Sequence, residues 1–547
     1  MGAESAQAQR AIVFVPFPAQ GHVTPMLHLA RALAGRGGVA ATVAVPDFVH
    51  RRMGQQDGDA GSRVALVPIP SGVPDDGGDE EPPGFASIAH AMEHHMPAHL
   101  EGVLARAGRG AAVACLVVDV MASWAVPVAA RCGVPAVGFW PVMFASYRVV
   151  AAIPELISKG FISRTGTPLP LSTNGINEAV NKHQQIGDLH ILPAKLELNT
   201  SDLPWLVGGA ASRESRFAFW LRTVDRGKSL TSILVNSFPG EGAGDSDRYD
   251  PPPGQHFLHV GPLFGDELLA RANSAATMWR ADSTCIDWLD RQSPGSVIYV
   301  SFGSWVAPIG QDKIAQLALG LKAAGRPFLW VLRNHPSWRA GLPDGFTETV
   351  AGRGKIVSWA PQEDVLRHDA VGCYITHCGW NSTLEAIRHG VRMICYPISG
   401  DQFVNRAYIV NMWEAGIALV GTDCDCVKDC IGRAMKGGEE GRRLQDNVAR
   451  MREAILAGEA RSIAKRNLDL FLEGIENDDT KIQQPKSLEP PARSIIIRAL
   501  AREQRNTKPK SKMEKHMAQT LIETDRRIPN ALRIAFGLCQ RPPPAPG

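Results

Sequence analysis

The sequence reads GCYITHCGWNSTLEAIRH from Gly372 to His389, a strand-like segment followed by a helix-like one. Its first residues, Gly372–Thr376, are mostly apolar or β-branched, as in a buried strand, whereas Ser382–His389 has the apolar spacing of a helix. A tight, glycine-containing turn joins the two. The first N–H groups of such a helix lack partners and lie at the positive end of its dipole. The stretch therefore predicts an α/β domain with an anion site that suits a diphosphate.

The same alternation of strand and helix continues on both sides of this stretch. In the second half of the chain we expect further strands at Ser296–Phe302, Pro327–Arg333, Ile356–Trp359 and Met393–Pro397. Helices are expected between and after them, at Asp312–Ala324, Glu363–Arg367, Gln402–Ala415 and Val427–Leu456.

The first third of the chain shows a similar pattern. Strands are expected at Ala11–Phe17, Val39–Val45, Val64–Ile69, Cys115–Val118 and Val134–Phe139, and helices at Pro25–Ala34, Ser87–Arg106 and Ser123–Arg131. Strands that are apolar on both faces and alternate with helices form parallel sheets covered on both sides. We therefore predict an α/β protein with two facing, doubly wound Rossmann-like domains. The cleft between them, beyond the carboxyl ends of the strands, is the expected ligand site.

Changes in composition mark the expected boundaries. The segment from Ile153 to about Asp250 is irregular and predicts loops and short helices, and a proline run ends it. We expect an N-terminal domain over residues 1–253, a C-terminal domain over 254–475 and a basic, proline-containing tail over 476–547. The tail is expected to be disordered apart from a helix near Arg493–Glu503, although an interaction tail is the alternative.

Charge and length restrict the possible partners. From Thr480 to Gly547 there are 14 basic against 5 acidic residues, while the whole chain has a net charge of +3, so the body is mildly acidic. An acidic body argues against a nucleic-acid surface. The apolar run Ala11–Phe17 is too short for a secretory signal, and no run reaches the roughly 20 residues of a membrane span. We expect a cytoplasmic protein with no integral membrane segment.

The cysteines predict neither disulfides nor a metal site. Ten are scattered along the chain, and in a reducing compartment they stay as thiols. Cys424, Cys426 and Cys430 form the only cluster, and it lacks an obvious fourth ligand at the spacing of a zinc site.

Side chains around the expected helix start suit the parts of a nucleotide sugar. His377, Asn381 and Ser382 can donate hydrogen bonds to a diphosphate. Glu385, one turn further along, can accept hydrogen bonds from two adjacent ribose hydroxyls.

Two flanking segments extend this pattern to a base and a sugar. Trp359 offers a flat face for a base, and Gln362 places an amide beside it. Asp401 and Gln402 supply acceptors and donors for the hydroxyls of a hexose. Taken singly, Trp359 could be a core aromatic, because large aromatic residues are usually packing residues. The joint spacing of these residues favours a binding site.

The segment from Trp359 to Gln402 spans 44 residues and resembles the signature box of the plant secondary-product UDP-glycosyltransferases. The similarity extends over most of residues 10–475 and includes FVPFPAQGHVTP at Phe14–Pro25 and VSFGS at Val300–Ser304. It implies the GT-B fold, with acceptor bound by the first domain and UDP-sugar by the second. The residues expected to bind the UDP-sugar are Ser304, Trp359, Ala360, Gln362, His377, Gly379, Trp380, Asn381, Ser382, Glu385, Asp401 and Gln402.

Transfer to a hydroxyl needs a base, and the sequence offers one with a partner. The resemblance places the catalytic histidine at His22, which we expect in a loop after the first strand. Asp119, at the end of the strand Cys115–Val118, can bind the other ring nitrogen, fix the tautomer and stabilise the imidazolium. Alternatively, His22 only caps the next helix, and Asp119 has a turn or N-cap role before Ser123.

The resemblance implies an inverting hexosyltransferase of plant secondary metabolism that forms a β-glucoside on a small lipophilic acceptor, with a phenolic or flavonoid favoured. In the family, Gln at position 402 accompanies UDP-glucose as the donor. No Asp-x-Asp pair stands at a strand end, so we expect no metal and no other cofactor. We also expect a monomer. Trp380 is expected to reach the sugar through its indole N–H or backbone, and the acceptor wall is expected from Phe17, Trp140, Phe144 and Tyr147.

Two other functions remain possible from the residues alone. A catalytically silent UDP-sugar-binding protein of the same fold would keep the donor site and lose the base pair, which His22 and Asp119 argue against. An epimerase or dehydrogenase would need a Gly-x-Gly-x-x-Gly turn after the first strand, and residues 16–21 read PFPAQG instead.

Overall fold

The computed structural model describes most of the first 476 residues. The described residues are 10–54, 64–73, 83–108, 112–170, 191–193, 195–196, 198–241, 251–264, 278–279, 281–304, 306, 308–435 and 438–476. All of them belong to one compact unit, Met1–Ala492. The predictions for the tail beyond Glu476, including its helix near Arg493–Glu503, lie outside the described residues.

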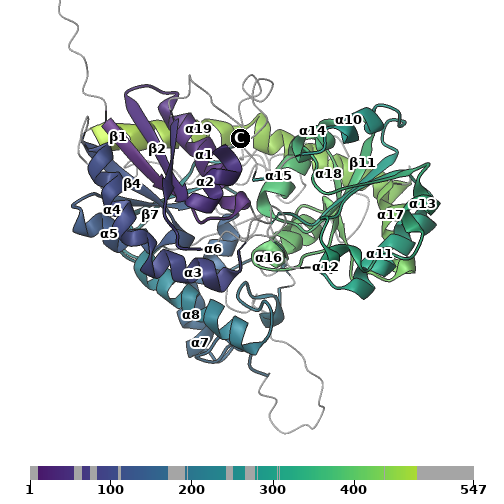
Figure 1. Cartoon of the computed structure of the whole chain (residues 1–547), viewed down its shortest axis with the longest axis horizontal. Helices are drawn as coiled ribbons and strands as arrows, with labels where there is room; N and C mark the ends of the chain where they lie inside the picture. Colours follow the sequence, from purple (N-terminus) through teal and green to yellow (C-terminus); the bar gives the residue numbers. More distant parts are fainter. Residues whose placement is uncertain are drawn as a thin grey trace, which may run out of the picture. The chain divides into compact units, whose positions relative to one another are not determined.

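Seven parallel strands form the first sheet, in the order β3-β2-β1-β4-β5-β6-β7. Of these strands, β1, β2, β4 and β7 are labelled in Figure 1. The chain runs outward from β1 to β3 and then returns to place β4 against the other side of β1. The order therefore reverses between β1 and β4, and ligands of doubly wound sheets bind at such a point. The strands are β1 Arg10–Val15, β2 Val39–Pro46, β3 Val64–Ile69, β4 Val113–Asp119, β5 Ala136–Trp140, β6 Ser232–Val235 and β7 His256–His259.

A second parallel sheet has the order β10-β9-β8-β11-β12-β13. Here the order reverses between β8 and β11, and β11 is the strand that leads into the turn at His377. Its strands are β8 Val297–Ser301, β9 Phe328–Val331, β10 Gly354–Val357, β11 Val371–Thr376, β12 Arg392–Cys395 and β13 Gly416–Ala418. The two sheets confirm the predicted pair of doubly wound domains.

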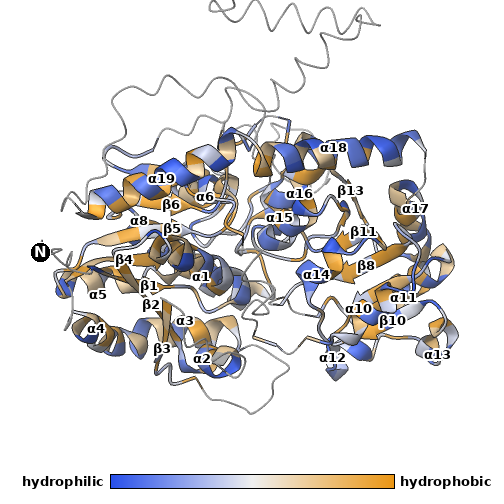
Figure 2. Ribbon diagram, turned by 90° about the horizontal axis from the view of Figure 1, so that it is seen from above, coloured by the Kyte–Doolittle hydropathy of each residue, from blue (hydrophilic) through white to orange (hydrophobic). Residues whose placement is uncertain are grey.

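Helices lie on both sides of each sheet, and the strands between them are the most apolar part of the fold (Figure 2). In the first half they are α1 Gln20–Ala34, α2 Asp47–Gly54, α3 Phe85–His94, α4 Met96–Ala107, α5 Ala125–Arg131, α6 Phe144–Ala151, α7 Ile153–Ser158 and α8 Ala210–Gly227. In the second half they are α10 Thr284–Leu289, α11 Gln311–Ala324, α12 Pro336–Arg339, α13 Phe346–Val350, α14 Gln362–Arg367, α15 Trp380–Arg388, α16 Gln402–Ala407, α17 Cys424–Met435, α18 Glu439–Leu456 and α19 Glu459–Glu476.

Three predicted helices are divided or cut short in the structure. The helix expected at Ser87–Arg106 is two helices that meet at His95, because Pro97 has no N–H to donate to the carbonyl oxygen of Glu93 and is tolerated in the first turn of a helix, where α4 begins. The one expected at Gln402–Ala415 ends as α16 at Ala407 and continues as a π-helical turn, Tyr408–Met412. The one expected at Val427–Leu456 is divided into α17 and α18, and Gly438 is the N-cap of α18.

The segment expected to hold only loops and short helices contains α8, which has 18 residues, and the strand β6. β7 follows the proline run and pairs with β6 in the first sheet. The expected boundary after residue 253 thus precedes a strand of the first sheet, and we propose that the N-terminal domain extends through His259.

The last described helix, α19, returns to the first sheet. It contacts β7, and the side-chain amide of Asn467 donates a hydrogen bond to the carbonyl oxygen of His259 at 2.8 Å. Asp469 pairs with Arg36, after α1, at 2.8 Å. A helix at the end of the second half therefore packs on the first domain, which a contiguous division of the sequence does not predict.

Candidate functional site

Four of the predicted site residues lie at the carboxyl ends of the strands between which the strand order of each sheet reverses. His22 follows β1, and Asp119 ends β4 beside it. Ser304 follows β8, and His377 follows the adjacent β11. The chain topology therefore places both halves of the predicted site at the positions where parallel sheets bind ligands.

The structure pairs His22 with Asp119. Nδ1 of His22 lies 2.7 Å from Oδ2 of Asp119, with 16% of the histidine side chain exposed and none of the aspartate. Asp119 Oδ2 also accepts from the N–H of Phe17 at 3.2 Å, and Oδ1 accepts from Met121 N–H at 2.9 Å. The carboxylate is held from both sides, so Nδ1 of His22 carries the proton and Nε2 keeps its lone pair.

The secondary structure around this pair differs from the prediction in one respect. His22 lies in the first turn of α1, which begins at Gln20, and not in a loop. No side chain caps α1, so His22 does not serve as a cap. Asp119 does cap the short 3-10 turn Val120–Ala122 and binds His22 as well, so it combines the two alternatives.

The pKa of His22 is raised by its neighbours. Burial by itself would lower the pKa, but the charge of Asp119, its hydrogen bond and the more distant Asp401 together raise it above the ordinary value. A histidine held in this way can take a proton through Nε2 and be stabilised as the imidazolium.

The turn between β11 and α15 has an uncommon backbone. Cys378 has a φ of +65°, in the left-handed region that few residues other than glycine adopt. Its N–H donates to Thr376 Oγ1 at 3.1 Å, and its carbonyl oxygen accepts from Asn405 Nδ2 at 2.8 Å. These contacts hold the turn so that α15 begins at Trp380, with Gly379 as its N-cap. Its first N–H groups lie at the start of a helix, where an anion is favoured.

His377 lies between two glycines at this turn. A Cβ on Gly303 or on Gly379 would lie 2.4 Å from Nε2 of His377. Only glycine at these two positions therefore leaves room for the imidazole ring. The ring is 7% exposed, and burial lowers its pKa to about 4. Nδ1 has no hydrogen-bond partner. His377 is therefore a neutral imidazole with one polar atom unused at the edge of the helix start.

Gln362, Ser382 and Glu385 form one network. Gln362 Nε2 donates to Ser382 Oγ at 2.9 Å and to Glu385 Oε2 at 2.8 Å. Its Oε1 accepts from the hydroxyls of Tyr299 at 3.2 Å and Tyr374 at 3.1 Å. Burial raises the pKa of Glu385 to about 7. The structure brings these three predicted residues together. The side-chain amide of Gln362 bonds to Ser382, Glu385 and the two tyrosines, and so it orients Glu385.

Trp359 is stacked against Trp279, with ring centroids 4.8 Å apart and an interplanar angle of 28°. One face of Trp359 is therefore covered from within the chain. Ala360, beside it, is buried. Trp279 was not predicted, because it lies outside the signature box and no sequence pattern links it to Trp359.

Asp401 and Gln402 lie at the start of α16. Asp401 Oδ2 accepts from Asn405 Nδ2 at 2.7 Å, and Gln402 Oε1 accepts from the N–H groups of Ile398 and Ser399, each at 2.8 Å. The amide oxygen of Gln402 thus fixes its own loop, and its NH₂ group is the part that can meet a ligand. Burial raises the pKa of Asp401, while the hydrogen bond from Asn405 and the charge of His22 oppose that shift.

Hydrogen bonds connect the two halves of the site. Asn381 Nδ2 donates to the carbonyl oxygen of Gly21 at 3.1 Å, and Gly21 directly precedes His22. Trp380 Nε1 donates to the carbonyl oxygen of Asn236 at 2.8 Å. This indole N–H therefore holds the first domain against α15, and the alternative that Trp380 meets the sugar through its backbone stays a prediction.

The aromatic residues predicted for the acceptor wall differ in their distance from the catalytic pair. Phe17 lies beside His22, with ring centroids 5.2 Å apart, and contacts Phe85 at 6.5 Å and Phe219 at 6.4 Å. The other three pack on one another and on rings near β7: Trp140, Phe144 and Tyr147. Of these, Trp140 also reaches Phe219 through Trp220. Phe85 and Phe219 were missed because they lie on α3 and α8, whose faces the sequence pattern did not resolve.

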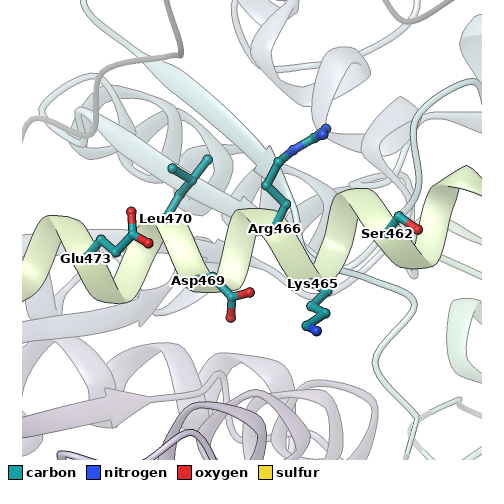
Figure 3. A pocket seen from close by; sticks show the side chains of 6 residues that line it. All are labelled: Ser462, Lys465, Arg466, Asp469, Leu470 and Glu473. Carbon is teal, nitrogen blue, oxygen red and sulfur yellow. The ribbon is translucent and has the colours of Figure 1, made fainter.

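Other features of the described residues give no competing site. A hollow along α19 is lined by side chains of that helix alone, among them Lys465, Asp469 and Glu473 (Figure 3). Among the described residues no group of three His, Cys, Asp or Glu side chains is arranged to hold a metal ion, and the cysteines there are free. None of the helices in that part of the chain is long and apolar enough to cross a membrane.

Two Rossmann-like sheets, with the His22–Asp119 pair in the first domain and a helix that starts at a tight turn in the second, are the arrangement of a GT-B glycosyltransferase. Comparison with known proteins agrees. Residues 280–427 match the family described as UDP-glucoronosyl and UDP-glucosyl transferase, and residues 8–137 match a glycosyltransferase N-terminal domain.

Individual relatives extend this similarity over most of the chain. UDP-glycosyltransferase 82A1 of Arabidopsis thaliana is 43% identical over 472 residues, which cover 83% of this chain and 96% of that protein. The DIMBOA UDP-glucosyltransferase BX8 of Zea mays is 36% identical, covering 81% and 94%. A solved UDP-glucosyltransferase from Polygonum tinctorium, capable of glucosylating indoxyl, aligns with a TM-score of 0.67 at 25% identity, covering 87% and 99%. The chain belongs to the plant family 1 UDP-glycosyltransferases and is a hexosyltransferase.

Proposed function

We propose that this enzyme transfers glucose from UDP-glucose to a hydroxyl of a small lipophilic acceptor, with a phenolic or flavonoid favoured, and forms a β-glucoside with inversion. The observation that carries the proposal is the hydrogen bond from Asn381 to Gly21 O at 3.1 Å. It joins the start of α15 to the residue before His22, so a diphosphate at the helix and an alcohol at the histidine share one region.

The donor is proposed to lie across the start of α15 and the network behind it. The diphosphate accepts from the first N–H groups of the helix and from Asn381 and Ser382. His377 stays neutral at physiological pH because its pKa is about 4, and it supplies an N–H without bringing a charge. Glu385, oriented by Gln362, accepts from the ribose, and the uncovered face of Trp359 stacks on the base.

The acceptor is proposed to lose its proton to Nε2 of His22. Asp119 holds the ring through Nδ1 and stabilises the imidazolium, while the acceptor oxygen attacks the anomeric carbon from the side opposite UDP. The positive end of α15 stabilises the charge that develops on the leaving diphosphate, a task that other transferases give to a divalent ion.

Glucose as the donor sugar is supported by Gln402 and by the relatives. The NH₂ group of Gln402 remains for a sugar hydroxyl, beside Asp401. The maize and Polygonum relatives are named glucosyltransferases that act on DIMBOA and on indoxyl, two small acceptors. The cytoplasmic location and the monomeric state stay predictions.

Addition of a chelator is expected to leave the proposed reaction unchanged. The purified full-length chain, given UDP-glucose, a panel of phenols and EDTA, should release UDP and form glucosides at the rate seen without EDTA, since α15 supplies the diphosphate site. A coupled enzymatic assay measures the release of UDP, and mass spectrometry detects the glucosides. Abolition by EDTA with recovery on adding Mg²⁺ would contradict the metal-independent mechanism. Binding of UDP-glucose without turnover on any acceptor would favour a silent binding protein.

Gly379→Ala is expected to raise the Kd for UDP by about tenfold, because overpacking a close contact costs about 1–3 kcal/mol. The added Cβ would lie 2.4 Å from His377 Nε2, while a φ of −60° tolerates alanine, so the effect is steric. Isothermal titration with UDP measures it. Gly352→Ala is the control, because a Cβ there meets no atom within 4 Å. Equal affinity in the two variants would remove His377 from the proposed diphosphate site.

A further inference from the structure

The helix α8 brings a second set of side chains to the catalytic pair. It contacts the 3-10 turn Val120–Ala122, which directly follows Asp119. Phe217 fixes the helix from its buried side, because it packs on Trp205 with centroids 5.1 Å apart and fills the space that a Cβ on Gly166 would need. Side chains on α8 therefore have a defined position relative to Asp119.

Two residues of α8 reach the aromatic cluster beside His22. Phe219 contacts Phe85 at 5.2 Å and Phe17 at 6.4 Å, and Phe17 contacts His22 at 5.2 Å. Arg216 precedes Phe219 by three residues and so lies on the same side of the helix. Its guanidinium carbon lies 4.2 Å from the centroid of the Phe85 ring.

Arg216 has no acidic partner among the described residues. It is half-buried, its Nε is buried with no hydrogen-bond partner, and no carboxylate of the described residues forms an ion pair with it. Burial lowers its pKa, and no neighbouring charge opposes this shift. A guanidinium that loses water without gaining a carboxylate is unfavourable, and stacking on one phenyl ring offsets only part of that cost.

We infer that Arg216 is a specificity-determining residue that binds an anionic group, most simply a carboxylate, on a hydroxylated aromatic acceptor. The inference rests on the proposed function and adds the substrate class: an aromatic acid whose ring packs on Phe17 and Phe85 while its hydroxyl meets His22. The planar guanidinium suits a carboxylate, which it can bind through two parallel hydrogen bonds. The aromatic cluster lies between the cation and the base, and it gives the ring of the acceptor an apolar surface.

The test compares acceptors that differ only in the anion. Initial rates are measured with UDP-glucose and 4-hydroxycinnamate, 4-hydroxybenzoate and the methyl ester of each. Wild type is expected to show a kcat/KM at least about tenfold higher for each acid than for its ester, the usual range for a hydrogen-bonded charge pair. Equal or better use of the esters by wild type would overturn the inference without any variant.

Substitution of Arg216 then tests whether this residue causes the preference for acids over esters. Arg216→Gln should raise KM for the acids about tenfold, with kcat/KM for the esters unchanged within about twofold, and Arg216→Lys should keep part of the preference. Arg213→Gln is the matched control, since Arg213 is exposed on the same helix and bonds Gly208 O. If Arg216→Gln lowered acids and esters equally, Arg216 would be structural.

Product analysis separates the two proposals. Glucosides on the phenol resist mild alkali, whereas glucose esters do not, so an alkali-labile product would place the carboxylate at His22 and overturn the inference. Absence of transfer to all four acceptors and to neutral flavonoids would contradict the proposed function itself. Transfer to the esters and flavonoids alone would leave the proposed function standing and contradict only the role of Arg216.

Discussion

His22→Ala is expected to lower kcat for glucosyl transfer by about a thousandfold, within the range of a general base, while the Kd for UDP stays within about twofold of wild type. The imidazole is the group whose Nε2 remains for the acceptor, because Nδ1 is bound to Asp119 at 2.7 Å. The proposed diphosphate site lies on α15 and contains no atom of His22. Single-turnover transfer and titration with UDP measure the two quantities.

His99→Ala is the control for this prediction, because His99 is an exposed histidine on α4, in the same domain. It should keep wild-type turnover. Turnover above about a tenth of wild type in His22→Ala would exclude His22 as the base, since a lost general base costs at least about a hundredfold.

Asp119→Asn is expected to reduce kcat by about a thousandfold as well, for a different reason. Asparagine keeps the shape and can still cap the turn at Met121, but its amide no longer requires the proton on Nδ1. The ring can then take the wrong tautomer, and the imidazolium loses its counter-charge. The measurement is kcat together with the melting temperature, which should fall by a few degrees if the amide no longer accepts from the buried N–H of Phe17. Activity close to wild type with an unchanged melting temperature would contradict the pairing.

The pH profile separates this variant from a merely unstable one. His22 must be neutral to accept a proton, so wild-type kcat/KM should fall as pH drops through the raised pKa of His22. Loss of the Asp119 charge lowers that pKa, so the acidic limb should move to lower pH in Asp119→Asn while the plateau decreases. A limb that stayed in place would show that another group controls it.

Much of the fold could be predicted because its strands are short, apolar and bounded by turn residues. β1, β8 and β11 are buried on both faces along nearly their whole length, and this leaves a strong apolar pattern in the sequence. Strands and helices that depend on tertiary contacts were not predicted. β7, with two histidines in four residues, is a strand because β6 lies beside it. The break at His95 and the π-helical turn after Ala407 are likewise local irregularities within otherwise helical patterns.

The sequence predicted a set of site residues, but it did not predict which residues those side chains contact. Spacing placed His377, Asn381 and Glu385 around one helix start, because a strand, a turn and a helix constrain each other locally. Spacing could not show that the Trp380 indole binds Asn236, because that bond joins residues far apart in the chain. The same applies to Trp279 on Trp359 and to Arg216 on Phe85. These contacts exist only once the two domains and α8 are in place.

A crystal structure with UDP and a bound phenolic acceptor would show whether the two ligands meet between α15 and His22. We expect phosphate oxygens within hydrogen-bonding distance of the N–H groups at the start of α15, and the acceptor oxygen about 3 Å from Nε2 of His22. A diphosphate bound elsewhere, or an acceptor hydroxyl that cannot reach His22 with both ligands present, would contradict this arrangement.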